Sequence, residues 1–257
     1  MRNIQKVFTP FFKVSKQTDY TIRFVWISFI LLLWSLTPTL IPGPIQVFNQ
    51  LVAYLSDTSF YFDIFASLEL TITAMLISIL IACTTAYLSP IPAFNFPAKI
   101  IMMLRFMSLL GFLFLFMSLL GDASKIKNAL LIFSVVPYFT LSLVNVINNI
   151  EQQEYDLWTT LGYSKWEQLW EIVIVGKADA IIEAVISNFS MAWVMMTIAE
   201  TKSMADGGLG VELFKADKYN YLDKVFALQL VIYALGFSIM FLLKKWRAKQ
   251  FPYTINE

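Results

Sequence analysis

Six stretches of about twenty mostly apolar residues constrain this chain more than any other feature. Inside a bilayer the backbone polar groups must be hydrogen-bonded within the chain, so each stretch is expected to cross as a helix. With 58% hydrophobic and 14% charged residues, the 257-residue chain has too little polar surface for a soluble globule. We therefore predict one all-α integral membrane domain. Its six expected transmembrane helices cover residues 22–40, 68–88, 101–120, 128–147, 178–199 and 225–243.

Positive charge is concentrated at the two ends of the chain. The residues concerned are Arg2, Lys6, Lys13, Lys16, Arg23, Lys244, Lys245, Arg247 and Lys249. By the positive-inside rule both termini are expected in the cytoplasm. This predicts a cytoplasmic N-terminal segment over 1–21, a transmembrane domain over 22–247 and a cytoplasmic C-terminal tail over 248–257. The net charge of +1 gives no reason to expect a nucleic-acid partner.

The connections place further expected elements on each side of the membrane. Residues 45–55 carry apolar side chains at helical spacing after Pro42-Gly43-Pro44, which predicts a short amphipathic helix at the outer interface. The proline-containing segment 89–99 is expected to be a tight cytoplasmic turn. The 148–177 loop then lies in the cytoplasm and the 200–224 segment outside.

The 148–177 loop is rich in acidic and aromatic residues. Leu157, Trp158 and Leu161 are spaced to form an apolar face on a short helix. Gly162 is placed to end that helix in a left-handed conformation, and Ser164 to cap the next one together with Glu167. We expect two short helices that meet at a sharp bend.

The same loop carries a recognisable spacing. Asp156-Leu157-Trp158 is followed after three residues by Gly162 and, after nine further residues, by Ile172-Val173-Ile174-Val175. This resembles the cytoplasmic signature of the permease subunits of bacterial ABC importers, E-A-A-x3-G-x9-I-x-L-P. The glycine, the isoleucine and their spacing are kept, whereas both alanines are larger residues here and the final proline is Val175.

The C-terminal third resembles one branch of that family, the nitrate, sulfonate and taurine type. Its similar residues are Trp193, Ala199-Glu200, Gly207-Gly208-Leu209-Gly210 and Lys244-Lys245-Trp246-Arg247. The resemblance covers about residues 22–247. The chain departs from the branch in lacking prolines around 106–113 and in carrying Ile186 where an arginine is usual.

The resemblance implies a fold like that of type I ABC importer permeases, with a coupling helix in the 148–177 loop. It also implies a bacterial inner (plasma) membrane complex with an ABC ATPase subunit dimer and an extracytoplasmic solute-binding protein. A second permease completes the complex, and a homodimer is expected, with a heterodimer as the alternative. This chain has no G-x-x-x-x-G-K-[ST] phosphate-binding sequence, so ATP and Mg²⁺ are expected in the ATPase and no cofactor in the permease.

The coupling function is expected at a set of residues in the loop, with an interfacial helix as the alternative interpretation. The set is Asp156, Leu157, Trp158, Leu161, Gly162, Tyr163, Ser164 and Ile172.

Two smaller sets lie in the fifth span. Ser187, Asn188 and Ser190 are candidates for lining the solute pathway, although serine and asparagine also serve as hydrogen-bonded contacts between helices. Trp193 and Glu200 are candidates for an outer gate or a contact with the binding protein, because the glycines that follow are expected to make the loop pliable.

The alternative function is a self-contained secondary transporter or a membrane enzyme. A proton-coupled carrier usually places several ionisable groups at mid-membrane, and few are found here. With no histidine and with Cys83 as the single cysteine, the sequence offers neither a catalytic constellation nor a metal-ligating set. The sequence leaves open whether the solute is a small anion or a small organic molecule.

Overall fold

The computed structural model describes residues 15–36, 41–204 and 206–252, and within these ranges it contains helices and no strands. The α-helices are α2 (Lys16–Ser35), α3 (Pro44–Ser56), α4 (Thr58–Leu88), α5 (Pro92–Met103), α6 (Leu109–Leu120), α7 (Ala123–Asn148), α8 (Gln152–Thr160), α9 (Lys165–Gln168), α10 (Ala178–Lys202), α11 (Leu209–Lys218) and α12 (Leu222–Gln250). A short 3₁₀-helix, η1 (Leu104–Phe106), and a π-helix, η2 (Leu169–Val175), complete the set.

The described residues do not confirm all six expected spans. Four helices, α4, α7, α10 and α12, are long and apolar enough, and a bent pair raises the number to at most five. The first predicted span corresponds to α2, whose early turns carry an ion pair between Asp19 and Arg23 that shortens its apolar part. The end predicted for that span, residues 37–40, lies outside the described residues.

The third predicted span, 101–120, is not one straight helix. Pro92–Phe106 and Leu109–Leu120 meet at 109°, because Met107 and Ser108 between them have extended backbone conformations.

The predicted turn over 89–99 is also shorter than expected. The α5 helix already begins at Pro92, a residue suited to a first helical turn, so Lys99 lies on a helix.

The centre of the bundle is α7, which packs mainly against α4 and α10. The buried side of α4 presents a row of small residues, among them Ser67, Ser78, Ala82 and Ala86. Small side chains allow the backbones of membrane helices to approach closely. The facing side of α7 contributes larger buried residues, including Leu131 and Phe139, which fill the space between the helices.

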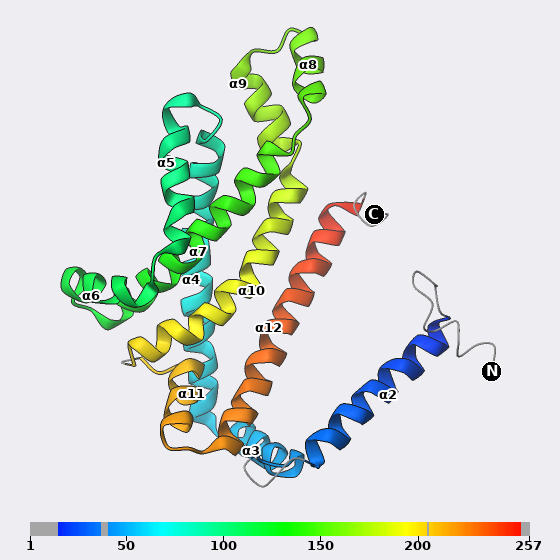
Figure 1. Cartoon of the computed structure of the whole chain (residues 1–257), viewed down its shortest axis with the longest axis vertical. Coiled ribbons are helices and arrows are strands. Elements are labelled where there is room, and N and C mark those ends of the chain that lie inside the picture. Colours follow the sequence, from blue (N-terminus) through cyan, green and yellow to red (C-terminus); the bar gives the residue numbers. More distant parts are fainter. Residues whose placement is uncertain (1–14, 37–40, 205, 253–257) are drawn as a thin grey trace.

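Figure 1 shows that the bundle has two distinct ends. The α8 and α9 helices project from one end, while α3 and α11 lie at the other. The helix predicted over 45–55 is confirmed as α3, with Val47 buried and Ile45 and Phe48 exposed. The α2 helix leans away from the other helices (Figure 1), and most of its apolar side chains are exposed in this single chain.

Candidate functional site

The bend between α8 and α9 is built by local backbone hydrogen bonds. The Gly162 N–H donates to the carbonyl of Thr159, and the Tyr163 N–H donates to that of Trp158. This is the Schellman pattern, which requires a left-handed residue after the helix, and Gly162 has φ +87°. The Trp158 and Tyr163 rings pack edge to face, with centroids 4.5 Å apart, and cover the bend. The conformation predicted for Gly162 is confirmed.

The start of α9 is a capping box, as the sequence predicted. The Glu167 N–H donates to the Ser164 hydroxyl at 3.4 Å, and the Ser164 N–H donates to the Glu167 carboxylate at 2.7 Å. Hydrogen bonds between the Glu167 carboxylate and Ser164 lower the pKa of the Glu167 carboxyl. The Ser164 side chain has the larger effect and its backbone N–H the smaller one. Both short helices therefore have defined ends at the bend.

The predicted apolar face of α8 divides into two parts. Leu157 and Leu161 are 59% and 63% exposed, whereas Trp158 turns back and packs on the core. Asp156 accepts a hydrogen bond from Gln152, which lies one turn earlier. The α8 helix thus begins four residues before Asp156, and Glu154, not Asp156, is the acid in its first turn.

The loop is anchored to the bundle through η2 and through an ion pair of α8. Ile172 and Val173 in η2 are buried, so Ile172 holds the loop in place and is not part of its exposed surface. Lys177, next to the start of α10, forms an ion pair of 2.9 Å with Glu154 in α8. The π-helix and this ion pair connect α8 to α10.

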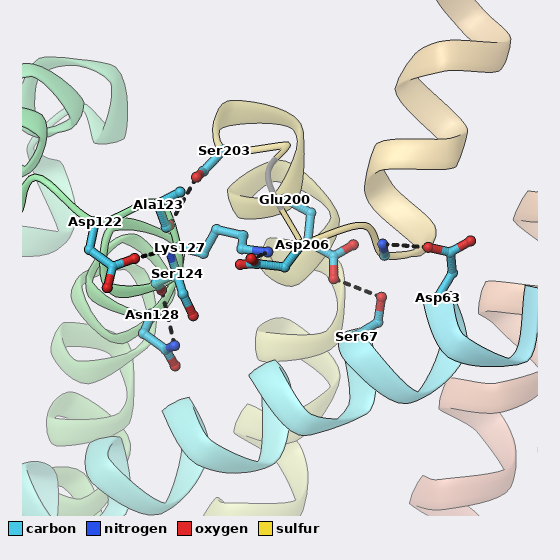
Figure 2. A network of polar contacts seen from close by, with 11 residues as sticks. Asp63, Ser67, Asp122, Ala123, Ser124, Lys127, Asn128, Glu200, Ser203 and Asp206 are labelled. Atoms are coloured by element: carbon cyan, nitrogen blue, oxygen red, sulfur yellow. Dashed lines mark hydrogen bonds and ion pairs between the residues drawn. The ribbon is translucent and has the colours of Figure 1, made fainter. Parts of the chain in front are cut away.

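A second polar site lies at the opposite end of the bundle, where three side chains bind the start of α11 (Figure 2). The Gly208 N–H donates to Asp63 at 2.8 Å, the Leu209 N–H to the Ser67 hydroxyl at 2.8 Å, and the Gly210 N–H to Glu200 at 2.6 Å. The Ser67 hydroxyl in turn donates to Glu200 at 2.7 Å. We call this arrangement the α11 cap.

The α11 cap satisfies backbone N–H groups that a helix start leaves without partners inside the helix. Two of its three side chains are carboxylates, which suit the positive end of a helix dipole. Because Asp63 and Ser67 come from α4 and Glu200 from α10, the cap joins three helices. Gly208 has φ +120°, and a Cβ there would collide with the Glu200 carboxylate.

The segment before α11 is also attached to α7. Lys127 is buried and pairs with Asp206 at 2.9 Å, and the Ser203 hydroxyl donates to the Ala123 carbonyl at 2.9 Å (Figure 2). The glycine-containing loop is therefore held by specific bonds, whereas the sequence predicted a pliable segment. Glu200 is 1% exposed, so its side chain offers no surface to a binding protein in this conformation.

Trp193 has a place different from the one expected for it. Its indole N–H donates to the Ile232 carbonyl in α12 at 2.9 Å, and the ring is buried between α10 and α12. It is a packing residue within the bundle and does not lie at an outer surface.

The three polar candidates of the fifth span do not share one face of α10. Asn188 is buried and donates to the Ala184 carbonyl and to Ser142 of α7, the interhelical contact that was the alternative interpretation. Ser187 and Ser190 are exposed, and the Ser190 hydroxyl donates to the Ser187 carbonyl. Of the three candidates, Ser187 and Ser190 present their side chains outside the bundle.

Sequence reasoning missed Asp63, Ser67 and Lys127. Asp63 and Ser67 are four residues apart just before the predicted second span, and Lys127 directly precedes the predicted fourth. Polar residues one helical turn apart at the edge of an apolar run are a signal of a shared helix face. That signal does not identify the partner, which lies more than 130 residues away in the sequence.

Comparison with known proteins gives two findings. The model of the family described as "Binding-protein-dependent transport system inner membrane component" matches residues 91–246. The fold is similar to a chain in the crystal structure of a bacterial ABC transporter involved in the import of the acidic polysaccharide alginate. The TM-score is 0.64 and the identity 12%, over 91% of this chain and 92% of that one. No curated protein matches.

Proposed function

This chain belongs to the family of binding-protein-dependent transport system inner membrane components, and from that premise we propose that it forms the solute pathway of an ATP-driven importer and receives force through α8. As a member of the family it is a multi-pass inner membrane permease subunit and not an enzyme. The proposal adds the route by which a separate ATPase dimer, binding ATP and Mg²⁺, acts on the chain.

One observation carries the proposal: Leu157 in α8 and Leu161 at its C-cap are both exposed, and α8 projects beyond the bundle (Figure 1). A leucine pair four residues apart forms one patch on a helix surface. Exposed apolar patches rimmed by polar residues mark protein contacts. The bend at Gly162 and the capping box at Ser164 hold the patch in one orientation, as a docking element requires.

Force applied to α8 has a direct path into the membrane domain. The loop continues through η2 into α10, and the Glu154–Lys177 ion pair fixes α8 to the beginning of α10. At its other end α10 is joined to α4 and α11 by the α11 cap. Displacement of α8 would then move these helices together as a rigid body, one of the common modes of switching in proteins.

At the outer end, the α11 cap and the Lys127–Asp206 ion pair together form the outer gate in this proposal. Opening the pathway moves the capped helices as one unit or breaks the bonds to Asp206 and Ser203. Ser187 and Ser190 face away from the rest of the chain and would line a pathway completed by a second permease copy.

The solute is proposed to be a small anion or a small organic molecule, on the basis of the resemblance to the nitrate, sulfonate and taurine branch. The alginate transporter supports the fold alone, because its identity to this chain is 12%. Selectivity is assigned mainly to the solute-binding protein. Thermal stabilisation of that protein by a panel of anions and neutral solutes tests this assignment, and a response to a polysaccharide alone would contradict it.

The coupling proposal is tested by co-purification of the full chain with its ATPase subunits. The double variant Leu157→Asp with Leu161→Asp is expected to lose the ATPase, because charge replaces the apolar patch. Tyr219→Asp, at the opposite end of the bundle and similarly exposed, is the matched control and should retain it. Gly162→Arg should also lose coupling, because a non-glycine residue at φ +87° costs about 1–2 kcal/mol and disfavours the bend.

The result that overturns the proposal is equally specific. If the double variant inserts normally and retains the ATPase with unchanged affinity, α8 is not the docking helix. Proton-driven uptake by the chain alone would favour the secondary transporter instead.

A further inference from the structure

Two adjoining cavities lie at the end of the bundle that carries α8. One, of about 340 Å³, is lined by residues from α5, the end of α7 and α8, among them Lys99, Asn148 and Tyr155. The other, of about 490 Å³, extends toward α9 and η2 and includes Lys165. The two share Pro90, Gln152 and Tyr155 in their linings. They are therefore neighbouring parts of one concave region next to the candidate docking loop.

The charged side chains that line this region are lysines. Each cavity is lined by one lysine, and neither lining includes an aspartate or glutamate. Glu154 pairs with Lys177, Asp156 accepts a hydrogen bond from Gln152, and Glu151, the exposed N-cap of α8, belongs to neither lining. The region therefore favours a negatively charged ligand.

Three polar groups in the first cavity are available to such a ligand. Among the described residues, the Lys99 ammonium, the Asn148 amide and the Tyr155 hydroxyl form no side-chain hydrogen bond or ion pair within the chain. Lys165, by contrast, donates to Gln168. Lys99 and Asn148 are exposed and Tyr155 is half-buried, so a ligand outside the chain can reach all three. An ammonium, an amide and a hydroxyl together suit the several acceptor oxygens of a phosphate group.

The position of the cavity indicates where the phosphate comes from. Lys99 lies on α5 two turns after the connection at residues 89–91, near the end of the membrane domain. Phe96, Ile100 and Met103 of the same helix are exposed, as expected for a face in contact with lipid. The cavity also contains Met102, Val144 and Ile147, which offer an apolar floor. A basic recess beside lipid-facing side chains is the usual setting for an anionic headgroup.

We propose that the cavity lined by Lys99, Asn148 and Tyr155 binds a phosphate group, supplied in the membrane by the headgroup of an anionic phospholipid. The headgroup bridges α5, α7 and α8 and so fixes the orientation of the docking loop relative to the membrane domain. This inference does not depend on the ATPase, because it concerns contacts of the permease chain alone.

The test is lipid binding by the full chain, purified in a neutral detergent and studied by native mass spectrometry. Phosphatidylglycerol and phosphatidylcholine are titrated separately, and inorganic phosphate and glycerol phosphate are added as soluble competitors. Wild-type protein is expected to bind phosphatidylglycerol in preference to phosphatidylcholine. Lys99→Gln is expected to weaken phosphatidylglycerol binding about tenfold, as the loss of one charged hydrogen bond implies. Asn148→Leu should weaken it in the same direction.

Lys245→Gln is the matched control. It removes an exposed lysine from the end of α12, outside the cavity, and should change the affinity by less than about threefold because only surface attraction is lost. Thermal unfolding of each variant separates loss of binding from loss of folding. Equal effects of Lys99→Gln and Lys245→Gln, or no preference for the anionic lipid, would overturn the proposal. Competition by inorganic phosphate at concentrations as low as those of the lipid would support the phosphate site but reject the lipid as its source.

Discussion

The Lys177 ammonium lies 2.9 Å from a carboxylate oxygen of Glu154, and this contact joins the segment before α10 to the first turn of α8. Both side chains are partly exposed. The contact is a direct polar link between the proposed docking helix and the membrane domain.

A double-mutant cycle measures that link. Lys177→Met, Glu154→Gln and the double variant are expected to give a coupling energy of about 0.5–1 kcal/mol in thermal unfolding, because the pair is partly screened by solvent. Spin-label distances between α8 and α10 should broaden in each single variant. A coupling energy of zero with unchanged distances would show that η2 alone holds α8.

Loss of the Glu200 carboxylate should lower the free energy of unfolding much more than loss of the Glu154–Lys177 ion pair. Glu200→Ala leaves the Ser67 hydroxyl and the Gly210 N–H without their acceptor, and each buried unpaired donor costs about 1–3 kcal/mol. Glu200→Gln should cost less, since its amide oxygen keeps one of the two bonds. Glu212→Ala, which removes a more exposed ion pair with Lys215, is the comparison and should cost below about 1 kcal/mol. Equal melting points of the alanine variants would contradict the α11 cap.

Gly208→Ala tests the same cap from the backbone side. A Cβ at this position would lie 2.7 Å from one Glu200 carboxylate oxygen, and the φ of +120° is strained for any other residue. We expect the free energy of unfolding to fall by about 1–3 kcal/mol from the backbone strain, with the collision adding to this loss. Gly43→Ala is the control, because a Cβ there meets nothing within 4 Å and φ is −68°. Gly43 is the N-cap of α3, where alanine is less favourable than glycine, so the control should lose at most about 1 kcal/mol. A loss as large as that of Gly208→Ala would point to a general effect of replacing glycine.

The capping box at α9 should be sensitive to acid. The pKa of Glu167 is lowered in the folded chain, so its stabilising contribution is present above the ordinary carboxyl value of 4.5 and is lost as the pH falls through the folded pKa. The protection factors of the backbone amides of residues 164–168 against hydrogen exchange should therefore fall below pH 4.5. Glu167→Gln keeps an acceptor without a titrating group and should show no such change. The same acid response in the glutamine variant would refute this assignment.

Several elements could be predicted from local sequence because short-range physics determines them. The amphipathic helix α3, the left-handed bend at Gly162 and the capping box of Ser164 with Glu167 each depend on residues within one or two helical turns. The same holds for the apolar stretches that became α4, α7, α10 and α12. The break at Met107 and Ser108 could not be predicted in this way, since neither residue is a proline or glycine.

Length, apolar content and local spacing are enough to predict a helical membrane protein with a capped two-helix loop. Helix packing determines which side chains of that loop are exposed, which face of α10 Asn188 occupies, and that Glu200 caps α11. Those outcomes depend on contacts between helices distant in the sequence, such as the bond between Ser67 and Glu200. A helical repeat shows which residues share a face, but the packing of the helices selects the partner that each face meets.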